Sequence, residues 1–296
     1  MRERLSQAGL YRDIAAKTLM DDLVAYEPAY PLWADGATKR RWMRLPSGTR
    51  IDTSDAEHWR FPVGTQFFKE FSLDGVLLET RVIERVADTG NDQADYWMGA
   101  FVWRPDGSDA ILAPDGATDV NGTAHDVPSQ ARCWSCHMGE PGHILGFSRL
   151  QLSKDDGVNV DWLADRRVVT VPSGRYAVPG DGAARNALGT LHANCGHCHS
   201  PNGVAWPDTQ IILRLTGTER TVAETEIYRT TVGVLAQLPT HPAHALRILP
   251  GSPENSALFH RMGRRGDRDQ MPPIATEIPD ERGLAWVAAW IRSLPR

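Results

Sequence analysis

The sequence has few cysteines, no long apolar run and no large excess of charge of either sign. Only four of its 296 residues are cysteine, which excludes a small fold held together by many disulfides. No stretch approaches the roughly 18 consecutive apolar residues of a membrane-spanning helix. Residues 1–19 also lack the apolar core of a secretory signal peptide. We therefore expect no transmembrane segment in this chain.

The charge balance gives no electrostatic footprint for nucleic acid. The formal net charge is −5, and the arginine-rich stretches at 39–41 and 261–268 are short. We therefore expect no nucleic-acid partner. A hydrophobic content of 41% with 23% charged residues excludes a disordered chain and predicts one or two globular domains.

All four cysteines lie in two copies of one pattern, CWSCH at 133–137 and CGHCH at 195–199. C-x-x-C-H is the attachment pattern of c-type haem. Two thiols within one helical turn can reach the two vinyl groups on one edge of a porphyrin, while the next residue's imidazole binds the iron. The sequence therefore predicts two covalently bound haem c groups, held by Cys133, Cys136 and His137 and by Cys195, Cys198 and His199.

Two other uses of paired cysteines fit the pattern less well. A structural zinc site needs four thiolates brought together, whereas 58 residues with other structural signals separate the two pairs. A thioredoxin-like redox pair would follow a buried strand in a βαβ unit, and neither pair does.

Haem attachment in bacteria takes place outside the cytoplasm, so the two patterns imply an exported protein. We expect a periplasmic or otherwise extracytoplasmic location, with the leader absent from the printed sequence. A lipid or membrane anchor removed upstream is the alternative.

The first part of the chain is typical of antiparallel β-structure. Apolar and β-branched runs at 64–71, 76–86, 96–104 and 109–112 alternate with turn signals, of which Asp74-Gly75 is the strongest. A helix is expected earlier, over Leu5 to Leu23. We predict a β-rich haem domain over 1–175.

The last part of the chain has helical periodicity instead. Apolar residues from Ala184 lead at helical spacing into Cys195, and an amphipathic helix follows Asp280 near the end of the chain. Residues rich in proline and glycine precede this part, and we expect a linker over 176–184. The predicted fold class is therefore α+β, with an all-α domain over 185–296.

The C-terminal part resembles class I cytochrome c domains of bacterial multidomain cytochromes. The matching pieces are CGHCH, then ILPGSPENS at 248–256, QMPP at 270–273 and the Trp290-Ile291 pair. This resemblance implies His199 as the proximal and Met271 as the distal iron ligand. Two prolines after Met271 stiffen its loop, whereas Met262 fits a core helix. The insert between 202 and 249 departs from the family pattern, and we expect strands or a partner surface there.

The N-terminal part is similar to uncharacterised bacterial di-haem cytochromes that carry the blocks PLWADGATKRRW, FPVGTQFFKEF and CWSCHMGEPGHILGFSRLQLS. Its order of β-hairpins followed by C-x-x-C-H also resembles the β-sheet family of lysine-crosslinked hydroxylamine-oxidising cytochromes and cytochrome c-prime-beta. We call the haem expected on Cys133 and Cys136 haem 1 and that expected on Cys195 and Cys198 haem 2. The resemblance makes Lys69 the position to test for a lysine role at haem 1; a surface lysine on a strand is the alternative.

The distal ligand of haem 1 stays open in the sequence. His137 is the proximal ligand by motif. His125 is a candidate distal ligand, because it can loop to the other face and Asp126 can orient its imidazole. Met98 on a strand, or no protein ligand, are the alternatives.

We expect a periplasmic di-haem cytochrome that transfers electrons between redox partners, such as another cytochrome, a dehydrogenase or an oxidase. Methionine ligation raises the potential of a haem, which suits an electron carrier better than an enzyme. The alternative is a haem enzyme in which an open haem 1 oxidises or reduces a small nitrogen or oxygen species and haem 2 is the electron port.

Overall fold

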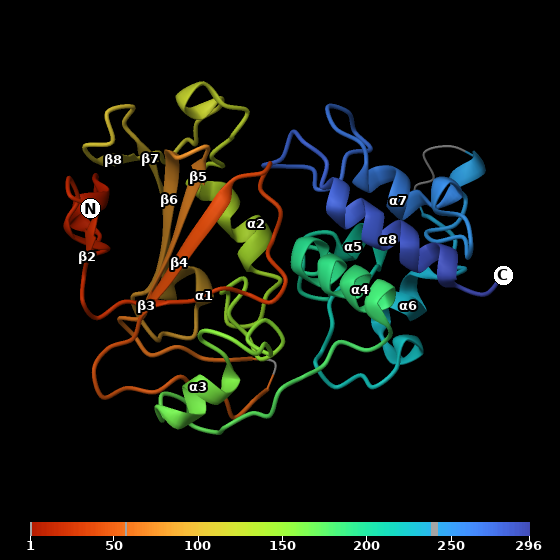
Figure 1. Cartoon of the computed structure of the whole chain (residues 1–296), viewed down its shortest axis with the longest axis horizontal. Coiled ribbons are helices and arrows are strands. Elements are labelled where there is room, and N and C mark those ends of the chain that lie inside the picture. Colours follow the sequence, from red (N-terminus) through yellow and green to blue (C-terminus); the bar gives the residue numbers. More distant parts are fainter. Residues whose placement is uncertain (1, 57, 238–241) are drawn as a thin grey trace. The chain divides into compact units, whose positions relative to one another are not determined.

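The computed structural model describes residues 2–56, 58–237 and 242–296, and the fold is of mixed α+β class (Figure 1). The chain forms two compact units. Unit 1 comprises Met1–Pro28, Gly36–Trp134 and Lys154–Gly174, and unit 2 comprises Ala29–Asp35, Ser135–Ser153 and Arg175–Arg296. Two segments of the expected first domain, 29–35 and 135–153, thus belong to unit 2. Within the described residues, no helix has both the length and the apolar character needed to cross a membrane.

Unit 1 is built on a six-stranded antiparallel sheet in which strands adjacent in the chain are adjacent in space. The strands are β3 (Val24–Ala25), β4 (Thr38–Arg44), β5 (Gln66–Leu73), β6 (Val76–Arg85), β7 (Tyr96–Trp103) and β8 (Ala110–Leu112). The predicted hairpin between β5 and β6 is confirmed. Its turn residues Asp74 and Gly75 have φ of +49° and +82°, as a type I′ turn requires. Short helices α1 (Asp92–Asp95) and α3 (Val160–Asp165) complete this unit.

Strand β4 is absent from the expected strands, and its burial explains why. Arg41, Trp42 and Met43 are consecutive and all buried. Both faces of the strand are therefore covered, and the alternation of polar and apolar residues that marks a half-exposed strand is missing.

The predicted helix from Leu5 to Leu23 is wrong. The segment forms a 3-10 turn at Leu5–Gln7 and the short strands β1 (Tyr11–Asp13) and β2 (Thr18–Leu19). Gly9 breaks any helix, because its φ is +84° and the Arg44 guanidinium lies 2.8 Å from where a Cβ would be. Leu5 and Leu10 pack instead with Trp42 and Phe68 against one face of the sheet.

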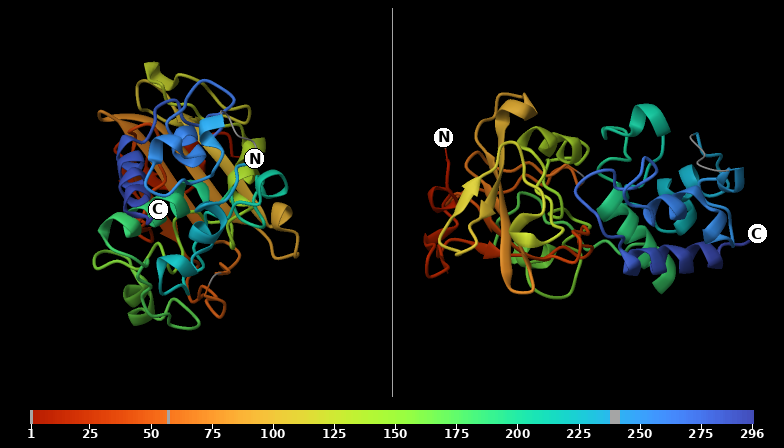
Figure 2. Two further views of the ribbon diagram at one scale, coloured as in Figure 1. Left: turned by 90° about the vertical axis from the view of Figure 1, so that its right-hand side faces the viewer. Right: turned by 90° about the horizontal axis from the view of Figure 1, so that it is seen from above.

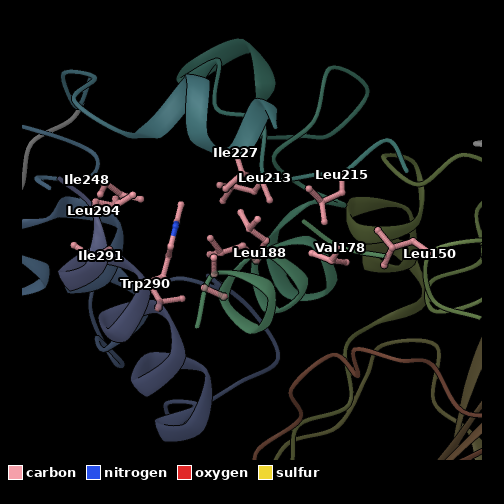
Figure 3. Packing of buried hydrophobic residues seen from close by; sticks show 14 of the residues in the cluster. Leu150, Val178, Leu188, Leu213, Leu215, Ile227, Ile248, Trp290, Ile291 and Leu294 are labelled. Carbon is pink, nitrogen blue, oxygen red and sulfur yellow. The ribbon is translucent and has the colours of Figure 1, made fainter. Parts of the chain in front are cut away.

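Unit 2 contains helices joined by long irregular segments. Its helices are α4 (Gly182–Cys195), α5 (Trp206–Thr209), α6 (Glu226–Thr231), α7 (Ala257–Met262) and α8 (Glu281–Ser293). Asp181 and Asp280 cap α4 and α8 by accepting hydrogen bonds from backbone N–H groups of the first turn. The two helices pack on each other (Figure 2), and Leu188 and Trp290 lie in the core between them (Figure 3). Both predicted helices are confirmed.

Two expectations about connecting segments differ from the structure. Tyr176 and Val178, in the expected linker 176–184, are buried in the unit 2 core, and α4 already begins at Gly182. For the insert we expected strands or a partner surface, and the structure has α6 over Glu226–Thr231 in place of a strand. Leu213, Leu215 and Ile227 of this insert are core residues (Figure 3), because apolar side chains of the insert supply part of the volume between the helices.

Candidate functional site

The second cysteine pair lies where α4 ends. Cys195 is the last residue of α4, and the backbone continues as one more turn. The Cys195 carbonyl accepts hydrogen bonds from Cys198 N–H at 3.1 Å and from His199 N–H at 2.8 Å. One turn thus carries both sulfur atoms and the imidazole. Burial raises the pKa of the Cys195 thiol to about 12, so this thiol is protonated at neutral pH.

Thr209 orients the His199 ring. The Thr209 hydroxyl donates to the Ala205 carbonyl at 2.8 Å, so its oxygen accepts from His199 Nδ1, which lies 3.4 Å away. Burial, together with the nearby charges of His197 and Arg247, lowers the pKa of His199 to about 4. The imidazole is therefore neutral, with its proton on Nδ1 and its lone pair on Nε2.

The first cysteine pair lies on α2 (Cys133–His137), and the division between the units falls after Trp134. His137 Nδ1 donates to the His143 carbonyl at 2.7 Å, and His143 Nδ1 donates to the His137 carbonyl at 2.9 Å. Because a carbonyl only accepts, the His137 proton is on Nδ1 and its lone pair is on Nε2. His137 and His199 therefore have the same tautomer, with a protein group holding Nδ1.

This shared arrangement fits the side chains expected to hold haem iron. A ligating histidine donates its second ring N–H to a protein acceptor, which fixes the tautomer and the orientation of the ring. In both motifs the thiols and the imidazole follow one another in a single helical turn. The donor sets therefore suit thioether attachment and iron ligation through Nε2 at each motif.

Residues 135–139, which include the end of the first motif, meet the second motif within unit 2. A ligand atom of Cys136, one of His197 and one of Cys198 all lie within 4.8 Å of one another. Cys198 Sγ lies 3.6 Å from the Ser135 carbonyl oxygen. A Cβ added at Gly139 would lie 1.8 Å from the His197 carbonyl oxygen, so only glycine permits this approach. Segments far apart in the sequence are thus packed directly against each other.

The close approach links the ionisation of the two thiols. A hydrogen bond from Cys198 and the neighbouring His197 lower the pKa of Cys136. The same hydrogen bond, with burial, raises the pKa of Cys198.

The same three residues form a candidate metal-ion site. The Nδ1 atom of His197 is buried and has no hydrogen-bond partner within residues 2–56, 58–237 and 242–296. Two sulfur atoms and an imidazole are ligands that zinc prefers. The separation of the cysteine pairs in sequence therefore does not argue against zinc, because the fold brings Cys136 and Cys198 together.

Met271 lies on a loop of unit 2 that is fixed at several points. Its N–H donates to the Arg261 carbonyl at 3.0 Å, and its carbonyl accepts from the Arg265 guanidinium at 3.3 Å. Arg265 also contacts Thr276 on the far side of the loop. Met262 ends α7 and packs against the core, as predicted.

Asp35 also holds this loop, a role that the sequence does not predict. Its carboxylate accepts hydrogen bonds from the Thr276 hydroxyl at 2.7 Å, Glu277 N–H at 3.0 Å and Ile278 N–H at 3.1 Å. The neighbouring Trp33 indole donates to the Ile278 carbonyl at 2.8 Å. No signal in the sequence links Asp35 to a loop more than 200 residues away, because local patterns do not report such contacts.

His125 lies in unit 1 and is buried. Its Nε2 donates to the Glu79 carboxylate at 2.9 Å, and its ring packs at a tilt against Phe71. Ligation of iron by His125 would therefore use Nδ1 or require loss of this hydrogen bond. Met98 is buried on β7, and Lys69 lies on β5.

Comparisons of the chain with protein-family models, with curated proteins and with solved structures found no significant match.

Proposed function

We propose that the chain is a c-type cytochrome with two covalently attached haems, one on each C-x-x-C-H motif. The observation that carries this proposal is the identical state of His137 and His199. In each, a protein acceptor holds Nδ1 and the lone pair is on Nε2. A zinc site at Cys136 and Cys198 would not require a histidine directly after the second cysteine of each motif.

We propose electron transfer as the function. Haem supplies reversible one-electron chemistry, and His/Met ligation favours a raised potential. The neighbouring positions of Cys136 and Cys198 support electron exchange between the two groups, because both are attachment residues. In this proposal His199 and Met271 bind one iron, and the helices of unit 2 form a class I cytochrome c domain. The redox partner is another protein in the periplasm or another extracytoplasmic compartment.

The test is expression with a bacterial leader and the c-type maturation machinery, followed by haem analysis. Intact-protein mass should show two haems per chain, and the pyridine haemochrome spectrum should have the position typical of two thioether bonds. Replacing Cys133 and Cys136 by alanine should remove one haem, and replacing Cys195 and Cys198 should remove the other. A chain that matures without covalent haem would contradict the proposal.

The cluster of Cys136, His197 and Cys198 supports a second candidate, a metal-ion site in a chain without haem. Zinc bound there would link segments 135–139 and 195–200. The candidates differ in their dependence on His197. If zinc is bound, His197→Ala loses the stoichiometric metal and His199→Ala keeps it. If haem is bound to Cys195 and Cys198, His199→Ala disturbs its iron ligation and His197→Ala does not.

A further inference from the structure

A row of three basic side chains crosses the middle of the unit 1 sheet. Lys69 of β5 is directly opposite Arg41 of β4 and Arg81 of β6, and these strands are neighbours in the sheet (Figure 1). Directly opposite side chains on antiparallel strands point to the same face, with Cβ atoms about 5 Å apart. The three cations are therefore adjacent on one face.

Among the described residues, two of these cations form no ion pair. Arg41 is only 6% exposed, and the one hydrogen bond of its guanidinium among the described residues is a long one, 3.4 Å, to the Lys39 carbonyl. Lys69 is partly buried and donates no hydrogen bond within the described part of the chain. Like charges directly opposite each other destabilise a sheet, and burial of an unpaired charge adds to that cost.

The buried carboxylate on this face is already committed. Glu79 is fully buried, and the Arg81 guanidinium donates to both of its oxygens, at 2.5 and 2.9 Å. His125 Nε2 donates to the same carboxylate at 2.9 Å. Glu79 is therefore hydrogen-bonded to Arg81 and His125, and among the described residues it makes no hydrogen bond with Lys69 or Arg41, although its charge attracts Lys69.

The other ionisable groups near the row do not supply the missing charge. Lys39 adds a further cation. Glu27 acts on Arg41 from an exposed position, where solvent weakens the attraction. Tyr26 is neutral, because burial raises the pKa of its hydroxyl to about 12. Burial and the charges of Arg41 and Arg81 hold the pKa of Lys69 well below its ordinary value, and the opposing attraction of the Glu79 carboxylate does not offset them.

We infer that Arg41 and Lys69 form a binding site for an oxyanion, most simply a carboxylate. A guanidinium offers two parallel N–H donors that match the two oxygens of a carboxylate, and an ammonium adds a point charge beside it. Phe67 and Phe71 lie two residues to either side of Lys69 on the same face, so the site has apolar flanks that strengthen the attraction.

Two sources supply this chemistry. One is a free small anion, and the other is a propionate carboxylate of a covalently attached haem. Only the second source rests on the proposed function. Binding of a free anion can therefore be tested whether or not the protein carries haem.

The experiment compares thermal unfolding of the mature protein in acetate, phosphate and chloride at equal ionic strength. The variants are Lys69→Met, which removes the charge and keeps an unbranched apolar chain, and Lys69→Arg, which keeps the charge. Lys154→Met is the matched control, because Lys154 is also in unit 1 and pairs with Asp156 away from the sheet. A ligand that binds only the folded state raises Tm.

If the site binds a free anion, Tm in acetate or phosphate is a few degrees higher than Tm in chloride. We expect this difference in the wild type, in Lys69→Arg and in Lys154→Met, and we expect it to be absent in Lys69→Met. For a propionate, added anions have no effect, but Lys69→Met lowers both Tm and the reduction potential of one haem. The absorption spectrum of the same samples shows whether haem is attached. Two results would overturn the inference. In the first, Lys69→Met changes neither the rise in Tm caused by acetate or phosphate nor the reduction potential of a haem. In the second, Lys69→Met raises Tm, which would show that the three cations only repel one another.

Discussion

The carboxylate of Asp35 accepts a hydrogen bond from the Thr276 hydroxyl at 2.7 Å, across 241 residues of sequence. The same carboxylate binds two further N–H donors of the loop that carries Met271. Asp35 and Thr276 are both buried. The loop expected to present sulfur to iron is therefore held by a residue from the N-terminal half of the chain.

We predict that Asp35→Ala loosens this loop before it affects the rest of unit 2. The change removes the acceptor of three donors, of which the Thr276 hydroxyl is buried and the Glu277 and Ile278 N–H groups belong to exposed residues, so the expected cost is about 1 kcal/mol. In the haem-loaded protein, the far-red charge-transfer band of methionine-ligated ferric haem should be lost at a lower urea concentration than in the wild type. Asp21→Ala is the control, since Asp21 is an exposed acid that pairs with Arg12 at the surface. Equal urea midpoints for the band in Asp35→Ala and in the wild type would remove Asp35 from this role.

We predict that Met271→Ala abolishes the far-red band and lowers the potential of one haem. The thioether stabilises ferrous iron, so its removal favours the ferric state. Met262→Leu is the control, because Met262 packs against the core at the end of α7. It should keep the band, with a loss of stability below about 1.5 kcal/mol. Persistence of the band in Met271→Ala would assign the ligand to another residue.

We predict that His125→Gln leaves the spin state of both haems unchanged. The His125 Nε2–H is donated to the buried Glu79 carboxylate, and a glutamine amide preserves a donor for that oxygen. His125→Ala removes the donor and should destabilise unit 1 by about 1–3 kcal/mol. Electron paramagnetic resonance of the ferric protein and urea unfolding measure the two effects. A new high-spin signal in His125→Gln would instead make His125 the distal ligand of haem 1.

The parts of the fold that the sequence predicts are those with a local cause. The turn at Asp74-Gly75 and the cap of α8 by Asp280 each depend on residues within a few positions. Strand β4 is not predicted because Arg41 is buried at a position where the alternation of polar and apolar residues indicates exposure. Lys69, the residue directly opposite Arg41 in the sheet, comes from another strand.

The candidate site shows the same limit. The C-x-x-C-H spacing predicts that Cys136 and Cys198 attach a cofactor, but nothing in that spacing predicts that the two motifs lie close together. Their approach depends on tertiary packing, in which Gly139 lies against the backbone of His197. The anchoring of the Met271 loop by Asp35 is likewise a long-range contact, and no local periodicity encodes it.

The pH dependence of stability should carry a contribution from His192 on α4. The side chain is 7% exposed, and its Nδ1 accepts a hydrogen bond from Leu215 N–H at 3.1 Å, so the neutral form is the one that fits. Burial, with the nearby charges of Arg214 and His197, lowers the pKa of His192 to about 3 in the folded state. In the unfolded chain the pKa of histidine is near 6.5.

Because the folded pKa is the lower one, the unfolded state binds more protons between these two values. Stability is therefore fully present above pH 6.5 and falls as the pH decreases toward 3, by at most about 1.4 kcal/mol per pH unit from this group. His192→Asn keeps an acceptor for Leu215 N–H but does not titrate, so its free energy of unfolding should fall less steeply between pH 6 and pH 4. Urea unfolding at several pH values measures the difference, with His58→Asn as the control because His58 is exposed beside Asp55. Parallel pH profiles for His192→Asn and the wild type would show that His192 does not couple protonation to folding.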